Sequence, residues 1–196
     1  MAIDKDAIRK HIRGILVALG DDPDREGLRE TPDRVARMYE EVFEGMNYSN
    51  DEIASMFSKS FEEGLSLKEG KKDMVLVKDI EIFSYCEHHL ALMYDMRASV
   101  AYIPDKKVLG LSKLARICDM AARRLQLQER LGSDISEIIR KAAGTEDVAV
   151  LIRGTHSCMA ARGIRKGSAQ TVTTTFSGCF DKDPEMRSRF FLMLNQ

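Results

Sequence analysis

The chain has 196 residues, of which 44% are hydrophobic and 31% charged. This length suits one domain, or one domain with a helical appendage. A chain of this size can bury a hydrophobic core large enough to be stable without disulfide bonds. The composition excludes global disorder and a coiled coil as descriptions of the whole chain. Thirty Lys and Arg against 31 Asp and Glu give a net charge of −1. No overall charge bias therefore favours nucleic acid or an anionic membrane as a partner.

The sequence predicts a cytoplasmic protein without a membrane segment. The longest apolar stretch near the N-terminus, residues 15–19, is far shorter than the ~20 residues of a membrane span. It also lies within an amphipathic pattern, unlike the apolar part of a signal peptide. Disulfides are rare in a reducing compartment, so each cysteine is interpreted as a buried thiol or a metal ligand. The four are Cys86, Cys118, Cys158 and Cys179.

Three helices are expected in the first 60 residues. Apolar residues recur at helical spacing over residues 4–20, which predicts an amphipathic helix that ends at a glycine. The charged segment 21–30 contains proline and glycine and is expected to be a loop. A second helix is expected over residues 31–45, with the hydroxyl of Thr31 as N-cap and a proline in the first turn. A short third helix is expected over residues 51–58.

From residue 73 the pattern changes to strands with helices inserted among them. Four segments that alternate or are rich in β-branched and aromatic residues are expected to be strands: residues 74–83, 91–103, 147–153 and 171–176. Three helices are expected to be capped by Ser112, Ser133 and Asp183. There is no regular β-α-β alternation, so we expect an α+β fold with an antiparallel sheet. An uncovered sheet edge in such a fold favours self-assembly.

The densest cluster of reactive side chains is Cys-Glu-His-His at residues 86–89, directly after a predicted strand. Cys86 and His89 are three residues apart, so one turn can present both to a single ion. A thiolate with an imidazole suits zinc better than magnesium or calcium. His156 and Cys158 follow another predicted strand, in which residues two apart face the same side. The two segments are therefore expected to share one metal site.

The number of ligands bears on what such a site does. Cys86, His89 and Cys158 would make three protein ligands, whereas a structural zinc usually has four. His88 and His156 would then lie beside the metal as groups able to move protons, as metal-assisted hydrolysis requires. Spacing does not decide between the two histidines of the pair. A closed zinc completed by the second histidine or the last cysteine is an alternative, as are separate residues that share no ion.

Two further patterns suit a nucleotide. Ser112 and Lys113 lie at a predicted helix start, where free N–H groups favour anions. Glu129, beside Gln128, can accept two hydrogen bonds from an N–H pair such as guanine offers. The alternatives are a solvated basic surface and a solvated helix end. The basic residues that would suit a polyphosphate are Lys113, Arg116, Arg162, Arg165 and Lys166.

Six ordered motifs resemble the GTP cyclohydrolase I family, the zinc-dependent type. They lie at residues 31–39, 86–89, 102–104, 110–116, 126–131 and 156–164. The resemblance extends from about residue 5 to residue 194 and implies the tunnelling fold, an antiparallel sheet with paired helices on one face. It divides the chain into a helical N-terminal region, residues 1–72, and a tunnelling-fold catalytic domain, residues 73–196. In this family five sheets join into a barrel, and two such rings stack into a homodecamer with active sites between subunits.

The resemblance also implies the reaction and the residues that perform it. Zinc-bound water would open the guanine imidazole ring of GTP at C8, giving 7,8-dihydroneopterin triphosphate and formate. His156 would be the principal proton donor and acceptor, assisted by His88, and Glu129 would anchor the guanine edge with Gln128 beside it. The zinc ligands would be Cys86, His89 and Cys158. The residues in contact with the ribose and triphosphate would be Ser112, Lys113, Arg116 and Arg162.

Two other functions compete with this one. Tunnelling-fold relatives that reduce nitriles need a catalytic cysteine and no zinc, and the complete Cys/His/Cys set argues against them. A zinc-stabilised protein that binds a nucleotide without catalysis is the second alternative. The downstream pathway of the product, and regulation by an end product or a partner protein, stay open. Cys118 falls on the apolar face of a predicted helix and is expected to be a core thiol.

Overall fold

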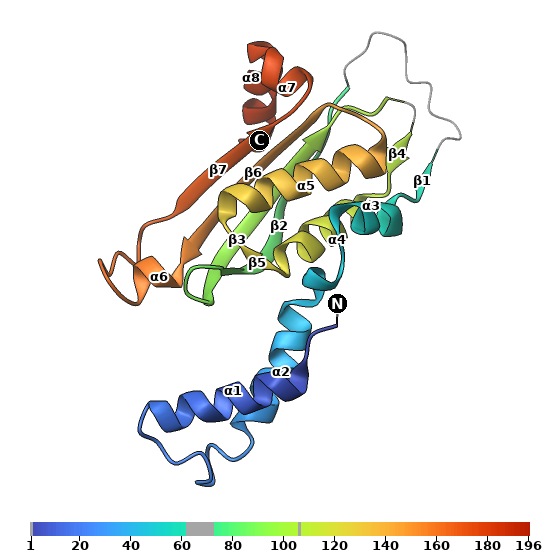
Figure 1. The fold of residues 1–196 in the computed structure, drawn as a ribbon. Coiled ribbons are helices and arrows are strands. Elements are labelled where there is room, and N and C mark those ends of the chain that lie inside the picture. Colours follow the sequence, from blue (N-terminus) through green and yellow to red (C-terminus); the bar gives the residue numbers. More distant parts are fainter. Residues whose placement is uncertain (1, 62–72, 106) are drawn as a thin grey trace.

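The structure, a computed structural model, describes residues 2–61, 73–105 and 107–196. Its helices and strands are shown in Figure 1. In chain order they are α1 (Lys5–Ala18), α2 (Thr31–Val42), η1 (Glu44–Asn47), α3 (Asn50–Phe57), β1 (Ser60–Phe61), β2 (Val75–Cys86), β3 (Ala91–Tyr102), β4 (Val108–Leu109), α4 (Leu111–Ala122), β5 (Leu125–Gln126), α5 (Gln128–Ala143), β6 (Val148–His156), α6 (Ser157–Ala160), β7 (Thr171–Phe176), α7 (Cys179–Lys182) and α8 (Pro184–Leu194).

The main sheet has the strand order β5-β2-β3-β6-β7. Strands β2, β3, β6 and β7 pair antiparallel, and only the two-residue β5 lies parallel to its neighbour β2. At one end of the sheet Cys86 pairs with Ala91, and Met93 pairs with His156. The ends of β2 and β6 therefore meet across the start of β3. The α+β fold with an antiparallel sheet is confirmed.

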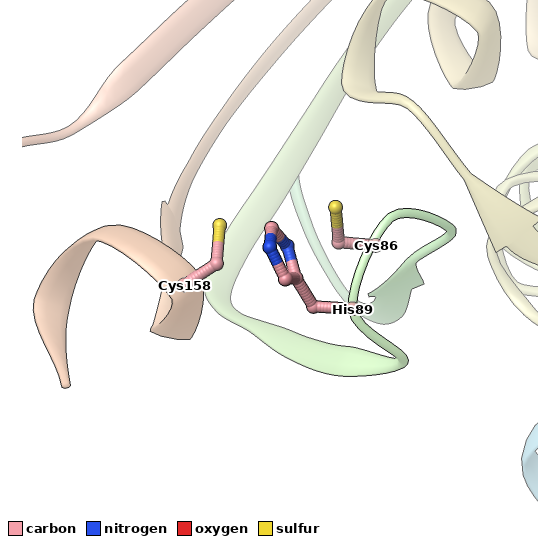
Figure 2. Close-up of side chains that lie close together, drawn as sticks. All are labelled: Cys86, His89 and Cys158. Atoms are coloured by element: carbon pink, nitrogen blue, oxygen red, sulfur yellow. The ribbon is translucent and has the colours of Figure 1, made fainter. Parts of the chain in front are cut away.

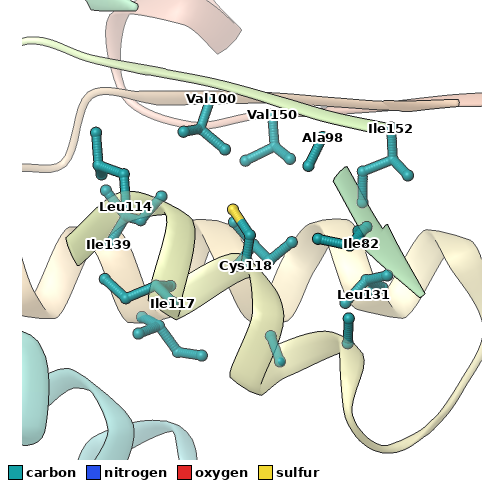
Figure 3. Packing of buried hydrophobic residues seen from close by; sticks show 14 of the residues in the cluster. Ile82, Ala98, Val100, Leu114, Ile117, Cys118, Leu131, Ile139, Val150 and Ile152 are labelled. Carbon is teal, nitrogen blue, oxygen red and sulfur yellow. The ribbon is translucent and has the colours of Figure 1, made fainter. Parts of the chain in front are cut away.

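Helices α4 and α5 cover one face of this sheet (Figure 1). Between them and the strands lies the main core (Figure 3), in which Ile82, Val100 and Val150 meet residues such as Ile117 and Leu131. Full burial of such a side chain stabilises the fold by about 1.5–3 kcal/mol. Strand side chains alternate between the two faces. Ala101 follows Val100 in β3 and Ala149 precedes Val150 in β6, so both alanines face the other side of the sheet. There they form a second cluster with Phe180 of α7 and Phe190 of α8.

Cys118 lies fully buried in the main core (Figure 3). Burial raises the pKa of its thiol to about 12, because the apolar surroundings disfavour the thiolate. A thiol that does not ionise is a packing residue rather than a metal ligand. The prediction of a core thiol at this position is confirmed.

Helices α1 and α2 pack together and extend away from the sheet (Figure 1). Ion pairs join them, from Lys5 to Glu40 and from Arg9 to Asp33. Helix α3 packs against α5, and β1 pairs with β4. No helix in the described residues is long and apolar enough to cross a membrane.

Three helix starts differ from those predicted. Thr31 is the first residue of α2 rather than its N-cap, which is Glu30. Helix α4 begins one residue before Ser112, with a glycine as N-cap. Helix α5 begins five residues before Ser133, because extended backbone at Leu127 starts the helix without any side-chain cap. The serine and threonine hydroxyls were therefore misleading as markers of where these helices begin.

The two strands that lead into the candidate site are longer than predicted. Strand β2 continues beyond residue 83 to Cys86, and β6 continues beyond residue 153 to His156. Cys158 lies on the helical turn α6 rather than in a strand. The prediction that His156 and Cys158 face the same side because they alternate along one strand is therefore wrong, since only His156 belongs to a strand. Elements that the sequence pattern does not predict are η1, β1, β4, β5, α6 and α7.

Gly45 of η1 packs so closely against the end of α4 that no side chain fits. A Cβ atom there would lie 2.1 Å from the carbonyl oxygen of Met120. We expect Gly45→Ala to lower the free energy of unfolding by about 1–3 kcal/mol, as overpacking does. The midpoint of urea unfolding measures this change. Gly14→Ala is the control, because nothing lies within 4 Å of that position on α1, and alanine there should stabilise the helix by about 0.5–1 kcal/mol. Equal midpoints for Gly45→Ala and the parent would contradict the packing.

Candidate metal centre

Cys86, His89 and Cys158 bring their ligand atoms within 4.8 Å of one another at one end of the sheet. Figure 2 shows the two thiols on either side of the imidazole. Tetrahedral zinc with Zn–S of about 2.3 Å and Zn–N of about 2.0 Å places neighbouring ligand atoms roughly 3.5–3.8 Å apart. Small side-chain rotations therefore suffice to close these three around one ion. His88 and Cys179, the alternative ligands, are not part of this group within the described residues.

The turn between β2 and β3 presents the first two of these side chains. Cys86 is buried at the end of β2, whereas His89 is exposed on the turn. The N–H of His89 donates to the carbonyl of Cys86 at 3.4 Å, and Leu90 closes the turn with φ of 51°. The N–H of Glu87 donates to the carbonyl of Gln126 at 3.1 Å. Backbone contacts from β5 therefore hold the turn in place.

Cys158 reaches the group from the short helix α6. The hydroxyl of Ser157 donates to the carbonyl of Leu92, which ties α6 to β3. Cys158 itself is half-buried. A centre with one buried, one half-buried and one exposed side chain keeps one side open to solvent. The described residues thus offer three candidate ligands, one fewer than a structural zinc usually has.

His156 ends β6, and its ring contacts the first turn of α5. Its Nε2 lies 2.9 Å from Oε1 of Gln128, which is only 1% exposed. Burial lowers the pKa of His156 below its ordinary value, and the carboxylate of Glu129 partly opposes this shift. The ring is therefore favoured in its neutral form, which can accept a proton. Glu129 is exposed in the first turn of α5, where the helix dipole favours a carboxylate.

Three of the four predicted phosphate-binding residues lie on α4, and the fourth, Arg162, lies in the loop after α6. Ser112 and Lys113 lie at the start of α4 and Arg116 lies at its middle, and the ammonium of Lys113 is 5.8 Å from the ring centroid of Phe57. The opposite end of α4 is the one near the metal group, since the hydroxyl of Ser84 in β2 donates to the last carbonyl of that helix. A helix of this length spans about 18 Å. One chain therefore does not bring Ser112 and Lys113 to the cysteines.

Two other predicted residues are near the candidate ligands in the sequence. Arg162 is exposed in the loop that follows α6, four residues after Cys158. The ring of His88 is perpendicular to that of His89, with 6.3 Å between the ring centroids. Both positions are compatible with a substrate bound at the open side of the cysteine–histidine group.

Sequence reasoning missed the supporting role of Arg130. Its guanidinium donates to the carboxylate of Glu87, to the carbonyl of Leu125 at 2.8 Å and to Oε1 of Gln126 at 3.0 Å. The amide of Gln126 donates in turn to Asp134 at 2.8 Å. Arg130 thereby connects α5 and β5 to the turn that carries two candidate ligands. The spacing of four residues between Gln126 and Arg130 is the only sequence signal of this link, and it is weak.

These features define an α+β protein with a group of two thiols and one imidazole at the end of the sheet where the half-buried His156 also lies. Comparisons with known proteins identify its family. The GTP cyclohydrolase I family model matches residues 8–195. A Clostridium botulinum (strain Kyoto / Type A2) protein named GTP cyclohydrolase 1 is 62% identical over 193 residues, 98% of each chain. A protein of the same name from Clostridium acetobutylicum is 62% identical over 194 residues, 98% of each chain. Another from Ruminiclostridium cellulolyticum is 58% identical over 193 residues, which cover 98% of this chain and 99% of the relative. The chain belongs to the GTP cyclohydrolase I family, as its motifs indicate.

Removing one thiol of the group tests whether it holds a metal. We expect Cys158→Ser to lose zinc on dialysis against a chelator, because serine replaces a soft thiolate ligand and leaves only two others. Zinc per chain, measured by atomic emission, reports the loss. Cys179→Ala is the matched control, since this cysteine lies outside the group, and it should keep its zinc. Full occupancy in Cys158→Ser would remove Cys158 from the ligand set.

The Arg130 link can be tested separately. We expect Arg130→Met to weaken zinc binding by about 10–100-fold, as loss of supporting contacts around metal ligands does. Competition with a chromogenic chelator measures the affinity. Arg140→Met is the control, because Arg140 pairs with Glu146 near the other end of α5. Equal affinities for the two variants would show that the turn holds its shape without Arg130.

Proposed function

We propose that the protein is a GTP cyclohydrolase I that opens the guanine imidazole ring of GTP at C8 and yields 7,8-dihydroneopterin triphosphate and formate. The observation that carries this proposal is the approach of Cys86, His89 and Cys158 within 4.8 Å of one another. The identity of 62% to proteins named GTP cyclohydrolase 1 supports it. We place the reaction in the cytoplasm, where thiols stay reduced.

Cys86, His89 and Cys158 would hold zinc, because two thiolates and an imidazole suit zinc better than magnesium or calcium. Bound by these three residues, the ion would supply a water nucleophile at neutral pH. The buried Cys86 and half-buried Cys158 would fix the ion against the sheet. The exposed His89 would complete the set from the solvent side.

His156 would move protons at the guanine ring. A proton given to N7 makes C8 electrophilic, and a half-buried imidazole at the end of β6 is suited to this exchange. His88, whose ring lies beside that of His89, would assist. Glu129 would accept hydrogen bonds from N1–H and the exocyclic amine of guanine, because its exposed carboxylate lies in the same helical turn as the partner of His156.

The triphosphate would be bound by Arg162 and by the start of α4. Ser112 and Lys113 lie at the far end of α4 in this chain and Arg116 at the middle of that helix, so we propose that a neighbouring subunit supplies them. The expected assembly is a homodecamer of two stacked pentamers. Strand β7 ends the described sheet, and its unpaired backbone groups would pair with a neighbouring sheet. Helix α1 has no buried residue, so contacts between subunits would cover its apolar side chains.

Incubation of the purified protein with GTP tests the proposed reaction. We expect formate and, after oxidation, a fluorescent pterin, with about one zinc per chain in the same sample. Formate release separates hydrolysis from mere binding. A protein that binds zinc and GTP but releases no formate would overturn the proposal and favour a non-catalytic nucleotide-binding protein.

Replacing His156 tests its role in proton transfer. His156→Ala is expected to keep zinc and GTP binding and to lose turnover by about 10²–10⁴-fold, the usual contribution of a positioned acid–base group. Steady-state rates and equilibrium binding of GTP separate the two effects. His11→Ala, at an exposed position on α1, should keep full turnover. Turnover of His156→Ala near that of the parent would show that another group moves the proton.

A further inference from the structure

We propose that Gln128 is a positioning residue, which holds the ring of His156 with Nε2 as a hydrogen-bond donor and leaves Nδ1 as the nitrogen that exchanges protons. The inference rests on the proposed function for its consequence in catalysis. Its structural part rests on hydrogen bonds within one chain. It assigns to Gln128 a contact with the protein rather than the contact with guanine that the sequence resemblance implies.

The surroundings of Gln128 determine how its amide is oriented. The side-chain nitrogen lies 3.1 Å from the carbonyl oxygen of Ile152 in β6 and 3.1 Å from that of Thr171 in β7. The hydroxyl of Thr173 lies 3.3 Å from the same nitrogen. Main-chain carbonyl oxygens only accept hydrogen bonds, so the group that faces them must be the NH₂ of the amide. Its two hydrogens are then both used.

The orientation of the amide determines which nitrogen of His156 carries the proton. With its NH₂ turned to the strands, Gln128 presents Oε1 to Nε2 of His156 at 2.9 Å. An amide oxygen only accepts, so Nε2 must donate. In a neutral imidazole the other nitrogen, Nδ1, then has the free lone pair. The hydrogen bond found for this ring within the described residues is the one at Nε2, so we assign the exchange of protons with a substrate to Nδ1.

Burial makes this arrangement rigid and excludes a direct contact of Gln128 with substrate. Gln128 is 1% exposed, and both ends of its amide already have partners. The amide also lies against β6 itself, because a Cβ at Gly154 would be 3.5 Å from Oε1 of Gln128, an ordinary packing distance. A buried amide whose hydrogen bonds are all made resists rotation, since rotation would leave buried donors and acceptors without partners.

The tautomer itself can be measured without any turnover. The zinc-loaded protein, labelled with ring-¹⁵N histidine, is studied by NMR at mildly alkaline pH, where imidazoles are neutral. His156→Asn assigns the signals of this residue. We expect a protonated Nε2 and an unprotonated Nδ1 in the parent protein, and a mixture of the two tautomers in Gln128→Met. A proton on Nδ1 in the parent, or an unchanged tautomer in Gln128→Met, would overturn the proposal, whether or not the protein acts on GTP.

Kinetics distinguish positioning from substrate binding. We expect Gln128→Met to lower kcat by about 10–100-fold with little change in KM for GTP, and to have no further effect when combined with His156→Ala. Gln126→Met is the matched control, because Gln126 is equally buried but bonds to Asp134 and not to His156. Its effect should add to that of His156→Ala, and the tautomer should stay unchanged. A rise in KM alone for Gln128→Met would assign this residue to guanine binding and contradict the proposal.

Discussion

The hydrogen-bond register of β3 with its two neighbours is the constraint on which the site depends. At the start of β3, Ala91 pairs with Cys86, and two residues later Met93 pairs with His156. A slip of one residue in either pairing would turn the side chains of that strand to the opposite face. The main core holds the register, because Ile82 and Val150 of the same strands are buried under α4 and α5. Packing far from the metal group thus determines whether its members meet.

The first turn of α5 supports both halves of the site. Gln128 points its amide to β6, β7 and His156, and Arg130, two residues later, contacts the turn that carries Cys86 and His89. Side chains two apart on a helix point in widely different directions, so one turn can serve two neighbours. Burial of Leu131 and Ile135 further along the helix fixes its position against the sheet. The first turn of α5 therefore supports both the turn that carries Cys86 and His89 and the ring of His156, whereas Cys158 is held through α6 and β3.

Sequence patterns predicted the strands and helices with long periodic segments but not the ends that form the site. Hydrophobic alternation identified β2 and β6, yet it stopped short of Cys86 and His156 because the reactive residues interrupt the apolar pattern. The bulge between Tyr94 and Arg97, where Asp95 has φ of 50°, leaves no hydrophobic signal. The cysteine and histidine motifs did predict which side chains meet. Hydrogen bonds such as that from His156 to Gln128 depend on three-dimensional contacts and could not be predicted.

The most direct test of this account is X-ray absorption spectroscopy at the zinc edge of the purified parent protein. The account predicts two sulfur neighbours at about 2.3 Å and one imidazole nitrogen at about 2.0 Å, with a fourth neighbour that no protein side chain supplies. A shell of four protein ligands, or a shell without two sulfurs, would contradict it.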